Sequence, residues 1–343
     1  MAFVTVLAYT SCSARGEPGF DQRTKEVGTV VVSNRLRYVS AIRTVMQDAQ
    51  GRYWIGSDRE GACMFDGKAF TYYSVEDGLC GLQVILIRED ASGTMWFLTS
   101  NGLCRFDGKR FARANPLGSS LTTQINDTDL WFPGDSAGSI VRVNRRLLSV
   151  HDNVVRIPGN ENPANYGITQ VQLSRSGGLW VGHLKGVVYY NGNRSEVYND
   201  STFGFDGNSM YMHVRSLLED SKGRLWIGNN GIGVQLKQGS DIQHFSALHG
   251  LVKGEEFAFP SPPGTLMHVF AITEDSKGNI WFGDRDTGAW RYDGNRVTNY
   301  VVDSTLNSQH IWDIYEDRNG RLLFAMAAGG VYECVGDAFR RVF

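Results

Sequence analysis

The sequence has few prolines, little net charge and no long apolar segment in its body. Its 34 basic residues nearly balance 36 acidic ones, which leaves a formal charge of −2. Binding to nucleic acid or to an anionic membrane through a strong positive field is therefore excluded. No internal stretch approaches the roughly 20 apolar residues that a membrane span needs. Only 8 prolines stand beside 40 glycines and 12% aromatic residues, a composition that favours short strands joined by tight turns.

Cysteine is also scarce, and its spacing carries little information. The five cysteines form no C-x-x-C pair and show no spacing typical of zinc ligands, so neither a zinc site nor a disulfide framework is implied. Cys63 and Cys104 occupy the same place in the segments GACMFDG and GLCRFDG. This repetition favours a small buried strand residue at both positions.

Residues 1–26 differ from the rest of the chain. The apolar run from Phe3 to Ala8 ends in Thr10-Ser11-Cys12 and resembles the end of a bacterial lipoprotein signal, in which such a cysteine is lipidated. The segment lacks a basic beginning, and Tyr9 stands where an aliphatic residue is usual. Two interpretations stay open: a protein of the periplasm or cell surface, touching the membrane only through a lipid on Cys12, or a cytoplasmic protein with an unprocessed tail.

A repeat built around one tryptophan fills the remainder, residues 27–343. The repeat has a period of about 35 to 55 residues, which is typical of propeller blades of four strands. Its members, with leucine in the last unit, are Trp54, Trp96, Trp131, Trp180, Trp226, Trp281 and Leu323. These large side chains are expected to fill the space between neighbouring blades rather than to form a site.

Unit six shows the pattern of one repeat most completely. An alternating strand from His268 to Asp275 is followed by the turn Ser276–Gly278, and two further strands flank the tight turn Asp293-Gly294. Single four-stranded sheets cannot bury both faces, so the units must stack around an axis. The sequence therefore predicts an all-β fold, a seven-bladed β-propeller of four-stranded antiparallel blades. Either residues 27–40 or residues 338–343 could supply the strand that closes the ring.

The shared motif I-x-E-D-x-x-G-x-x-W-I-G, followed by G-(L/V)-x-x-(F/Y)-D-G, resembles the two-component regulator propeller repeat. The resemblance covers residues 41–343 and implies the fold of the ligand-sensing regions of bacterial hybrid histidine kinases. More distantly, the units are similar to those of streptogramin lyases, propellers that act through a histidine and a metal near the central channel. That second likeness implies an enzyme on the same architecture.

Long connections identify the face of the propeller on which a site is expected. The tight turns lie on one face, whereas residues 151–167, 199–212 and 246–267 belong to connections on the other. Loops on a rigid scaffold usually carry function, so the site should lie above units four to six.

Three histidines recur at equivalent positions on that face. Counting seven residues back from the residue before the first turn of each unit leads to His213, His268 and His310 in units five to seven, and to Gln83 in unit two. Each begins the innermost strand, so the three imidazoles are expected to converge at the channel mouth. They could contact a ligand, hold a divalent transition metal such as zinc, iron or copper, or only bond loop carbonyls.

Further candidates come from neighbouring loops and complete the functional hypotheses. Asp284 and Arg285 could bind a hydroxylated or carboxylated ligand, and Tyr211 precedes His213 by two residues. The leading hypothesis is an exported propeller that binds a small molecule or glycan fragment at the channel mouth. Two alternatives stay open: a metal-dependent enzyme of the lyase or oxygenase type that uses the three histidines, and a platform for a protein partner.

Overall fold

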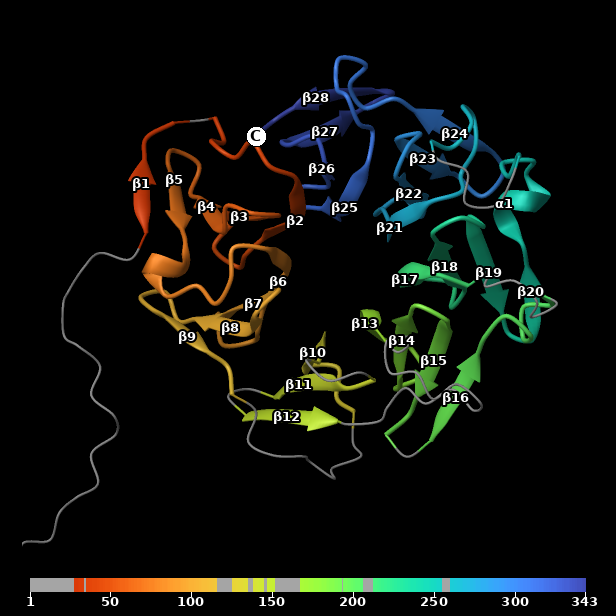
Figure 1. Cartoon of the computed structure of the whole chain (residues 1–343), viewed down its shortest axis with the longest axis horizontal. Helices are drawn as coiled ribbons and strands as arrows, with labels where there is room; N and C mark the ends of the chain where they lie inside the picture. Colours follow the sequence, from red (N-terminus) through yellow and green to blue (C-terminus); the bar gives the residue numbers. More distant parts are fainter. Residues whose placement is uncertain are drawn as a thin grey trace, which may run out of the picture.

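Seven antiparallel sheets follow one another along the chain and stand around a single axis (Figure 1). The structure, a computed structural model, describes residues 28–33, 35–115, 125–134, 138–144, 147–151, 167–192, 194–205, 212–254 and 260–343. The predicted seven-bladed β-propeller is confirmed. We number the sheets as blades 1 to 7 in chain order. Cys12, and with it the predicted lipid anchor, lies outside the described residues.

Each blade begins beside the central channel and runs outward. The inner strands are β2 (Ile42–Gln47), β6 (Val84–Glu89), β13 (Ile168–Leu173), β17 (Val214–Glu219), β21 (Val269–Glu274) and β25 (Ile311–Glu316). The second strands are β3 (Tyr53–Ser57), β7 (Met95–Thr99), β10 (Leu130–Pro133), β14 (Leu179–His183), β18 (Leu225–Asn229), β22 (Ile280–Asp284) and β26 (Leu322–Met326). Blade 3 has three described strands, because residues 116–124 are not described.

The outer half of each blade consists of two shorter strands. The third strands are β4 (Ala62–Phe65), β8 (Gly102–Phe106), β11 (Ile140–Asn144), β15 (Gly186–Tyr190), β19 (Val234–Gln238), β23 (Ala289–Tyr292) and β27 (Val331–Val335). The fourth strands are β5 (Phe70–Tyr73), β9 (Phe111–Arg113), β12 (Leu147–His151), β16 (Ser195–Tyr198), β20 (Asp241–Gln243), β24 (Val297–Tyr300) and β28 (Ala338–Arg341). The remaining elements are β1 (Thr29–Val31), the 3₁₀ turn η1 (Val75–Asp77) and the one-turn helix α1 (Phe245–Leu248).

An aspartate and a tryptophan six residues apart hold the first turn of four blades. The indole Nε1 of the tryptophan donates to the carboxylate at 2.8 Å in the pairs Asp48–Trp54, Asp90–Trp96, Asp220–Trp226 and Asp275–Trp281. The same carboxylate accepts backbone amides of its turn. Each tryptophan packs in the core while its one polar atom is satisfied, which is what a buried indole requires. In blade 4, where Ser174 replaces the aspartate, Trp180 donates to Glu219 of the next blade.

The glutamate that precedes this aspartate links neighbouring blades. Its carboxylate accepts a backbone amide from the first turn of the previous blade, in the pairs Glu89–Ala49, Glu219–Arg175, Glu274–Ser221 and Glu316–Ser276. Between blades 7 and 1, Gln47 takes the place of the glutamate and accepts the amide of Arg318. The Glu-Asp dipeptide of the repeat therefore fastens one turn within its blade and one turn of its neighbour.

The ring closes between blade 7 and blade 1 without exchange of strands. Residues Ala338–Arg341 form β28, the outer strand of blade 7, whereas Thr29–Val31 pairs with β5 as an additional outer strand of blade 1. The C-terminal Phe343 packs against the rings of Tyr53, Phe65 and Phe70 of blade 1. The amide of Val45 in β2 also donates to Asp313 in β25 at 3.1 Å. Side-chain packing and hydrogen bonds therefore join the two ends of the ring.

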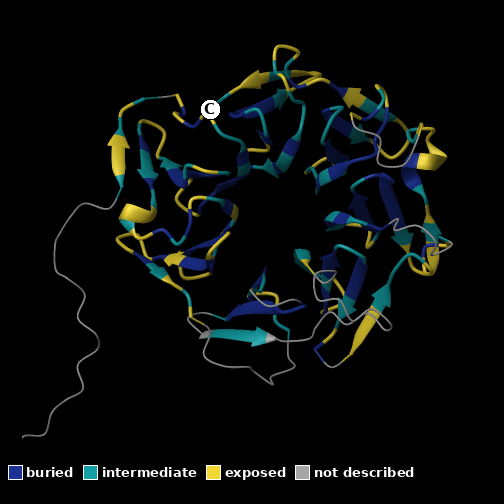
Figure 2. Ribbon diagram, viewed as in Figure 1, coloured by how far each residue is buried: buried dark blue, intermediate teal, exposed yellow. Residues whose placement is uncertain are grey.

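Burial follows the radial order of the strands. Buried residues gather on the second and third strands of the blades, exposed ones lie mainly on the outer strands and turns, and inner strands such as β6, β13 and β25 are only partly buried (Figure 2). All five residues of β3, β7, β18, β22 and β26 are buried. None of the helices in the described ranges is long and apolar enough to cross a membrane.

Candidate functional site

The residue that precedes each inner strand occupies an equivalent position in six blades. Its carbonyl oxygen accepts the amide of the residue that follows the second strand, at 2.8–3.2 Å. The accepting residues are Ala41, Gln83, Gly167, His213, His268 and His310. The predicted equivalence of these positions is confirmed, and Ser119, its expected member in blade 3, lies outside the described residues. Three histidines thus stand in a row at one mouth of the channel, on blades 5, 6 and 7.

The three imidazoles have different surroundings. The ring of His268 is 1% exposed, and its Nδ1 lies 2.8 Å from Oδ1 of Asn230 in the previous blade. The ring of His310 packs against Phe270 and Trp312, with centroids 4.7 and 4.1 Å away. Nε2 of His213 and Nε2 of His310 are buried and have no hydrogen-bond partner among the described residues.

Burial and nearby cations keep two of these histidines neutral. Burial, followed by the charge of Arg215, lowers the pKa of His213 to about 4. Burial, followed by the charge of Arg285, lowers the pKa of His310 to about 3. Near neutral pH each ring therefore has one nitrogen that donates and one that accepts, and both could bond to a ligand.

Binding of a metal by the three histidines stays a prediction. In the part of the chain that the structure describes, no group of three or more histidine, cysteine, aspartate or glutamate side chains is arranged to hold a metal ion. The physical reason is the separate engagement of the rings: His268 faces Asn230, and His310 lies within an aromatic cluster. The three residues stay candidates for ligand contact, which does not require convergence on one point.

The other predicted residues of the mouth serve mainly to shape the loops. Asp284 is fully buried, and its two oxygens accept the amides of Met267, His268, Asp286 and Thr287. Burial raises its pKa to about 6. Its carboxylate is therefore occupied by backbone groups and does not face a ligand. Tyr211 lies outside the described residues.

Arg285 and Gln83 are tied to carboxylates at the mouth. Arg285 forms an ion pair with Asp286 at 2.9 Å. Gln83 donates to Oδ1 of Asp58 at 2.8 Å, and Arg43 pairs with the same oxygen at 3.1 Å. These contacts place the side chains of blades 1, 2 and 6 around the opening.

Sequence reasoning missed the residues that line the channel itself. In six blades the pairing of the inner and second strands shifts by one residue, which marks a β-bulge. A bulge leaves one residue of the inner strand unpaired and turns its side chain aside. These residues, all of which line the central cavity, are Arg43, Ile85, Thr169, Arg215, Phe270 and Trp312.

The cavity between the inner strands has a volume of about 380 Å³, which suits a small ligand. Its wall is mixed in character. Arg43, Arg215, Phe270 and Trp312 come from blades 1, 5, 6 and 7. Blades 2, 3 and 4 contribute mainly aliphatic side chains, which are Ile85, Leu86, Leu98, Pro133, Ile168 and Val171, together with the polar Arg88, Thr169 and Gln170.

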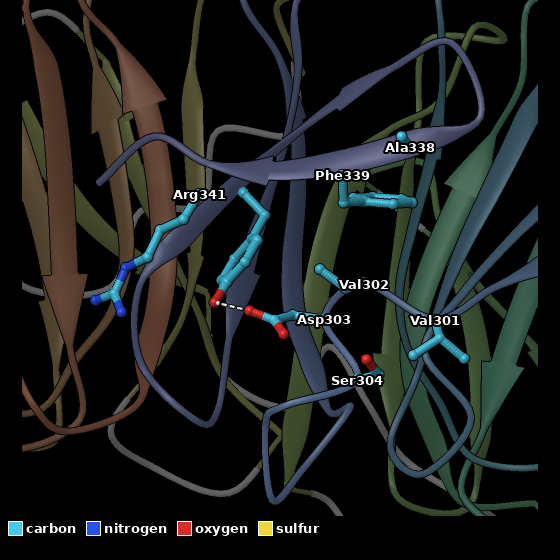
Figure 3. A pocket seen from close by; sticks show the side chains of 8 residues that line it. Val301, Val302, Asp303, Ser304, Ala338, Phe339 and Arg341 are labelled. Carbon is cyan, nitrogen blue, oxygen red and sulfur yellow. Dashed lines mark hydrogen bonds between the residues drawn. The ribbon is translucent and has the colours of Figure 1, made fainter.

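A second hollow lies at the outer rim of blade 7 (Figure 3). It occupies about 560 Å³ between residues 301–304 and strand β28. Its carboxylate, Asp303, already accepts bonds from Thr305 and from the hydroxyl of Tyr332, at 2.6 and 3.0 Å. Because its polar groups are satisfied and the hollow is open to solvent, we assign it no function.

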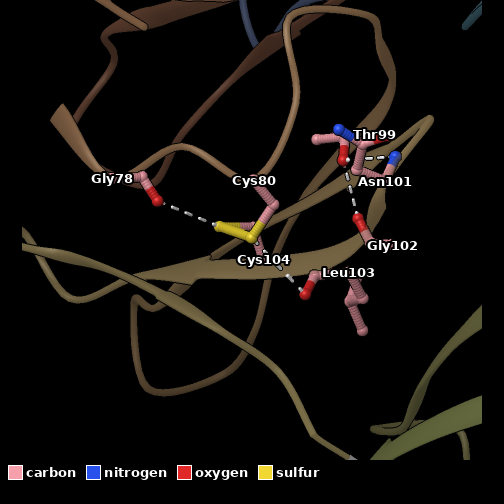
Figure 4. The surroundings of a disulfide bond; sticks show 7 residues. All are labelled: Gly78, Cys80, Thr99, Asn101, Gly102, Leu103 and Cys104. Atoms are coloured by element: carbon pink, nitrogen blue, oxygen red, sulfur yellow. Dashed lines mark hydrogen bonds between the residues drawn. A yellow bond between two sulfur atoms is a disulfide. The ribbon is translucent and has the colours of Figure 1, made fainter. Parts of the chain in front are cut away.

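One disulfide joins Cys80 to Cys104, a pairing that the spacing did not predict (Figure 4). Cys104 is a fully buried residue of β8, in agreement with the sequence prediction, whereas Cys80 belongs to the connection between blades 1 and 2. Cys63, the equivalent of Cys104 in blade 1, is buried and free. The bond fastens a connection on the histidine-bearing face to the body of blade 2.

Comparisons with known proteins support the repeat assignment. Residues 208–231, 264–286 and 305–327 match the family model described as two component regulator propeller. The resemblance inferred from the repeat motif is thereby confirmed for units five to seven. No curated protein matches the chain in sequence.

Several solved structures share the fold. The extracellular domain of a one component system from B. thetaiotaomicron matches 90% of this chain with a TM-score of 0.63 and 18% identity. The extracellular domain of a hybrid two component system from the same organism matches 89% of this chain with a TM-score of 0.60 and 19% identity. The chain spans only 39–40% of those two chains. Virginiamycin B lyase from Staphylococcus aureus matches 88% with a TM-score of 0.62 and 15% identity, and 97% of it is covered. At these identities the likeness shows the fold alone.

Proposed function

We propose that this chain is an exported ligand-binding propeller of the sensor type, which takes a small molecule or glycan fragment into its central channel from the face that carries His213, His268 and His310. The observation that carries the proposal is the 380 Å³ cavity, into which six bulged strands direct their unpaired residues. Bulges at equivalent positions bring side chains of very different chemistry to one axis. A concave cavity in which polar groups converge beside aliphatic and aromatic side chains is typical of small-molecule sites.

Two observations support a location outside the cytoplasm, in the periplasm or at the cell surface. The Cys80–Cys104 disulfide belongs to a class of bond that persists in oxidising compartments. Structures with the same fold include extracellular domains of one component and hybrid two component systems. Export, with a lipid anchor at Cys12, is part of the proposal.

A metal-dependent enzyme is not proposed. The likeness to virginiamycin B lyase is one of fold, at 15% identity. The three histidines that such chemistry would use form no metal-holding group in the described residues.

A channel-blocking variant tests the proposal. Ile85→Trp fills the cavity, because Ile85 lines it and has an exposed fraction of 40%. Val335→Trp places the same side chain on the outer strand of blade 7, at a residue with an exposed fraction of 52%. Thermal-shift screening with small acids and glycan fragments should find ligands that stabilise the wild type, by about 2.7 kcal/mol at a concentration one hundred times the Kd.

The two variants separate channel binding from binding elsewhere. We expect the stabilisation to persist in Val335→Trp and to disappear in Ile85→Trp. Ligands that stabilise both variants equally would place binding outside the channel and overturn the proposal. A screen without ligands, accompanied by capture of a protein on the histidine face, would favour the interaction platform instead.

A further inference from the structure

Two arginines and two aromatic rings form a continuous row of contacting side chains along the channel wall, which we call the ladder. The guanidinium of Arg43 lies over the ring of Trp312, with Cζ 3.9 Å from the centroid. The ring of Phe270 meets Trp312 edge to face at 5.2 Å. The guanidinium of Arg215 lies 5.2 Å from the centroid of Phe270 on the other side. The ladder thus runs through blades 1, 7, 6 and 5, and each member is the bulged residue of its inner strand.

The two ends of the ladder differ in charge compensation. Arg43 forms an ion pair with Asp58 at 3.1 Å. Nε of Arg215 is buried and has no hydrogen-bond partner among the described residues. Burial, followed by the like charge of Arg43, lowers the pKa of Arg215, and no carboxylate acts on it in the opposite direction. The guanidinium stays charged because its ordinary pKa lies far above neutral pH.

Among the arginines that line or flank the cavity, Arg215 is left without a carboxylate partner. Arg88 is matched by the buried carboxylate of Asp313, which acts on its pKa in the raising direction. Arg285 is matched by Asp286 at the mouth. The contact with Phe270 stabilises Arg215 only in part, since a cation–π contact is worth about 0.5–2 kcal/mol. Withdrawing a cation from water without a counter-ion is costly, so the partly buried guanidinium of Arg215 would gain from an anionic ligand.

From this arrangement we infer that the ligand is a small carboxylate with an apolar ring, for example an aryl-substituted short-chain acid. The inference rests on the proposed function and narrows its ligand class. The carboxylate accepts hydrogen bonds from Arg215, whose guanidinium can donate to it bidentately. The ring lies against aliphatic side chains of the same cavity, among them Ile85, Leu98 and Ile168.

Four probes separate the two halves of the inference. 3-Phenylpropionate carries both the charge and the apolar ring, whereas 3-phenylpropionamide keeps the ring without the charge. Acetate and glucuronate keep the charge without the apolar ring. In titration calorimetry of the full chain we expect 3-phenylpropionate to bind at least about tenfold more tightly than each of the other three, since one charge-assisted bond or one buried ring contributes that much.

Matched arginine variants locate the carboxylate. Arg215→Gln should weaken binding of 3-phenylpropionate at least about tenfold and leave 3-phenylpropionamide unchanged. Arg296→Gln removes an exposed arginine on the opposite face and should change neither. Binding should also quench tryptophan fluorescence in the wild type and not in Trp312→Phe.

The outcomes distinguish failure of the inference from failure of the proposed function. Equal affinities of Arg215→Gln and Arg296→Gln for 3-phenylpropionate would overturn the inference, as would tighter binding of glucuronate or of a neutral glycan. If such a glycan lost its binding in Ile85→Trp, the channel would still be a ligand site of another class. If no ligand responded to Ile85→Trp, the proposed function would fall as well.

Discussion

The hydrogen bonds that Asp220 accepts from its turn and from Trp226, which we call the clamp, explain why the repeat conserves its shape at the first turn, and replacing Asp220 tests that explanation. Oδ1 of Asp220 accepts the amides of Lys222 and Arg224, both at 2.9 Å. Its Oδ2 accepts Nε of Arg224 at 2.6 Å and Nε1 of Trp226 at 2.8 Å. The aspartate and the tryptophan are both 0% exposed. Asp220→Ala therefore removes four bonds at once and leaves a buried indole N–H without a partner.

The size of the effect follows from these contacts. An unsatisfied buried donor costs about 1–3 kcal/mol, and breaking a buried ion pair costs about 3–5 kcal/mol. The side chain of Arg224 keeps an exposed fraction of 14% and can turn towards water, so the lower part of the second range applies. We expect a loss of about 3 kcal/mol in the free energy of unfolding. For a chain of this length that corresponds to a decrease in Tm of about 4 °C.

An aspartate in the turn between a third and a fourth strand provides the control. Asp293 accepts only the amides of Asn295 and Arg296 and is exposed. Asp293→Ala should change the Tm by no more than about 1 °C. Urea unfolding followed by tryptophan fluorescence and by circular dichroism measures both variants. If Asp220→Ala unfolded with the same midpoint as Asp293→Ala, the clamp would not stabilise the blade and the explanation of the repeat motif would be wrong.

The dependence of stability on pH provides a second test of the bonds to Asp220. Although burial acts to raise the pKa of Asp220, bonds from Trp226 and Arg224 outweigh it and lower that pKa below its ordinary value. A lowered pKa means that the carboxylate contributes stability above the unfolded value near 3.9, which is lost as the pH falls through the folded pKa. The midpoint of Asp220→Ala should therefore fall less than that of the wild type between pH 5 and pH 3.

Three further predictions concern the mouth, the disulfide and the contacts between blades. The pKa of His310 is lowered to about 3, so the imidazole takes up a proton in the unfolded chain at a higher pH than in the folded one. Between pH 7 and pH 5 the wild type should therefore lose about 2 kcal/mol more in the free energy of unfolding than His310→Phe does. Equal losses would refute this. Replacing Cys80 and Cys104 by alanine should cost about 3 kcal/mol for a separation of 24 residues, and dithiothreitol should lower the wild-type Tm without affecting the variant. Glu274→Ala removes its bonds to Ser221 of blade 5 and should cost about 1 kcal/mol in urea unfolding.

The architecture was predictable because the repeat encodes it locally. The alternation in each inner strand, the Asp-Gly turns and the tryptophan period each depend on residues within one unit, and stacking follows because no unit can bury both faces. The same locality explains why equivalent positions such as His213 and His310 could be counted correctly. Closure was less predictable, since Thr29–Val31 and Ala338–Arg341 both have strand patterns and only tertiary packing places them on different blades.

The disulfide could not be predicted from spacing. Cys63 and Cys104 occupy equivalent strand positions, yet only Cys104 forms a bond. The difference lies in the connection that crosses above each strand. Cys80 comes from the connection between blades 1 and 2, and the repeat motif does not specify the path of that segment. A pairing of this kind depends on the geometry of two segments rather than on either sequence alone.

The channel residues were missed because a bulge changes which face of a strand a residue occupies. Simple alternation from His213 assigns Arg215 to the same face of the strand as the histidine. The shift in pairing between Val214 and Ser216 leaves Arg215 unpaired instead, and it enters the channel. A signal was nonetheless present. The residue five places before the turn aspartate is arginine or an aromatic residue in blades 1, 5, 6 and 7, where a regular strand would favour an aliphatic side chain.

This position also explains how one repeat can build a site without symmetry. The Asp48–Trp54 and Asp220–Trp226 pairs are alike because they hold the same kind of turn in their blades, whereas the bulged residue differs from blade to blade. Arg43 and Arg215 therefore line one cavity together with aliphatic and aromatic residues at the equivalent positions of other blades. Exchanging the bulged residues of two blades, as in the double variant Ile85→Arg and Arg215→Ile, would preserve the clamps and move the unpaired charge to blade 2. We expect such a variant to fold with a Tm near that of Arg215→Gln and to lose its preference for 3-phenylpropionate over the amide, because the charge would then lie among the aliphatic side chains of blade 2.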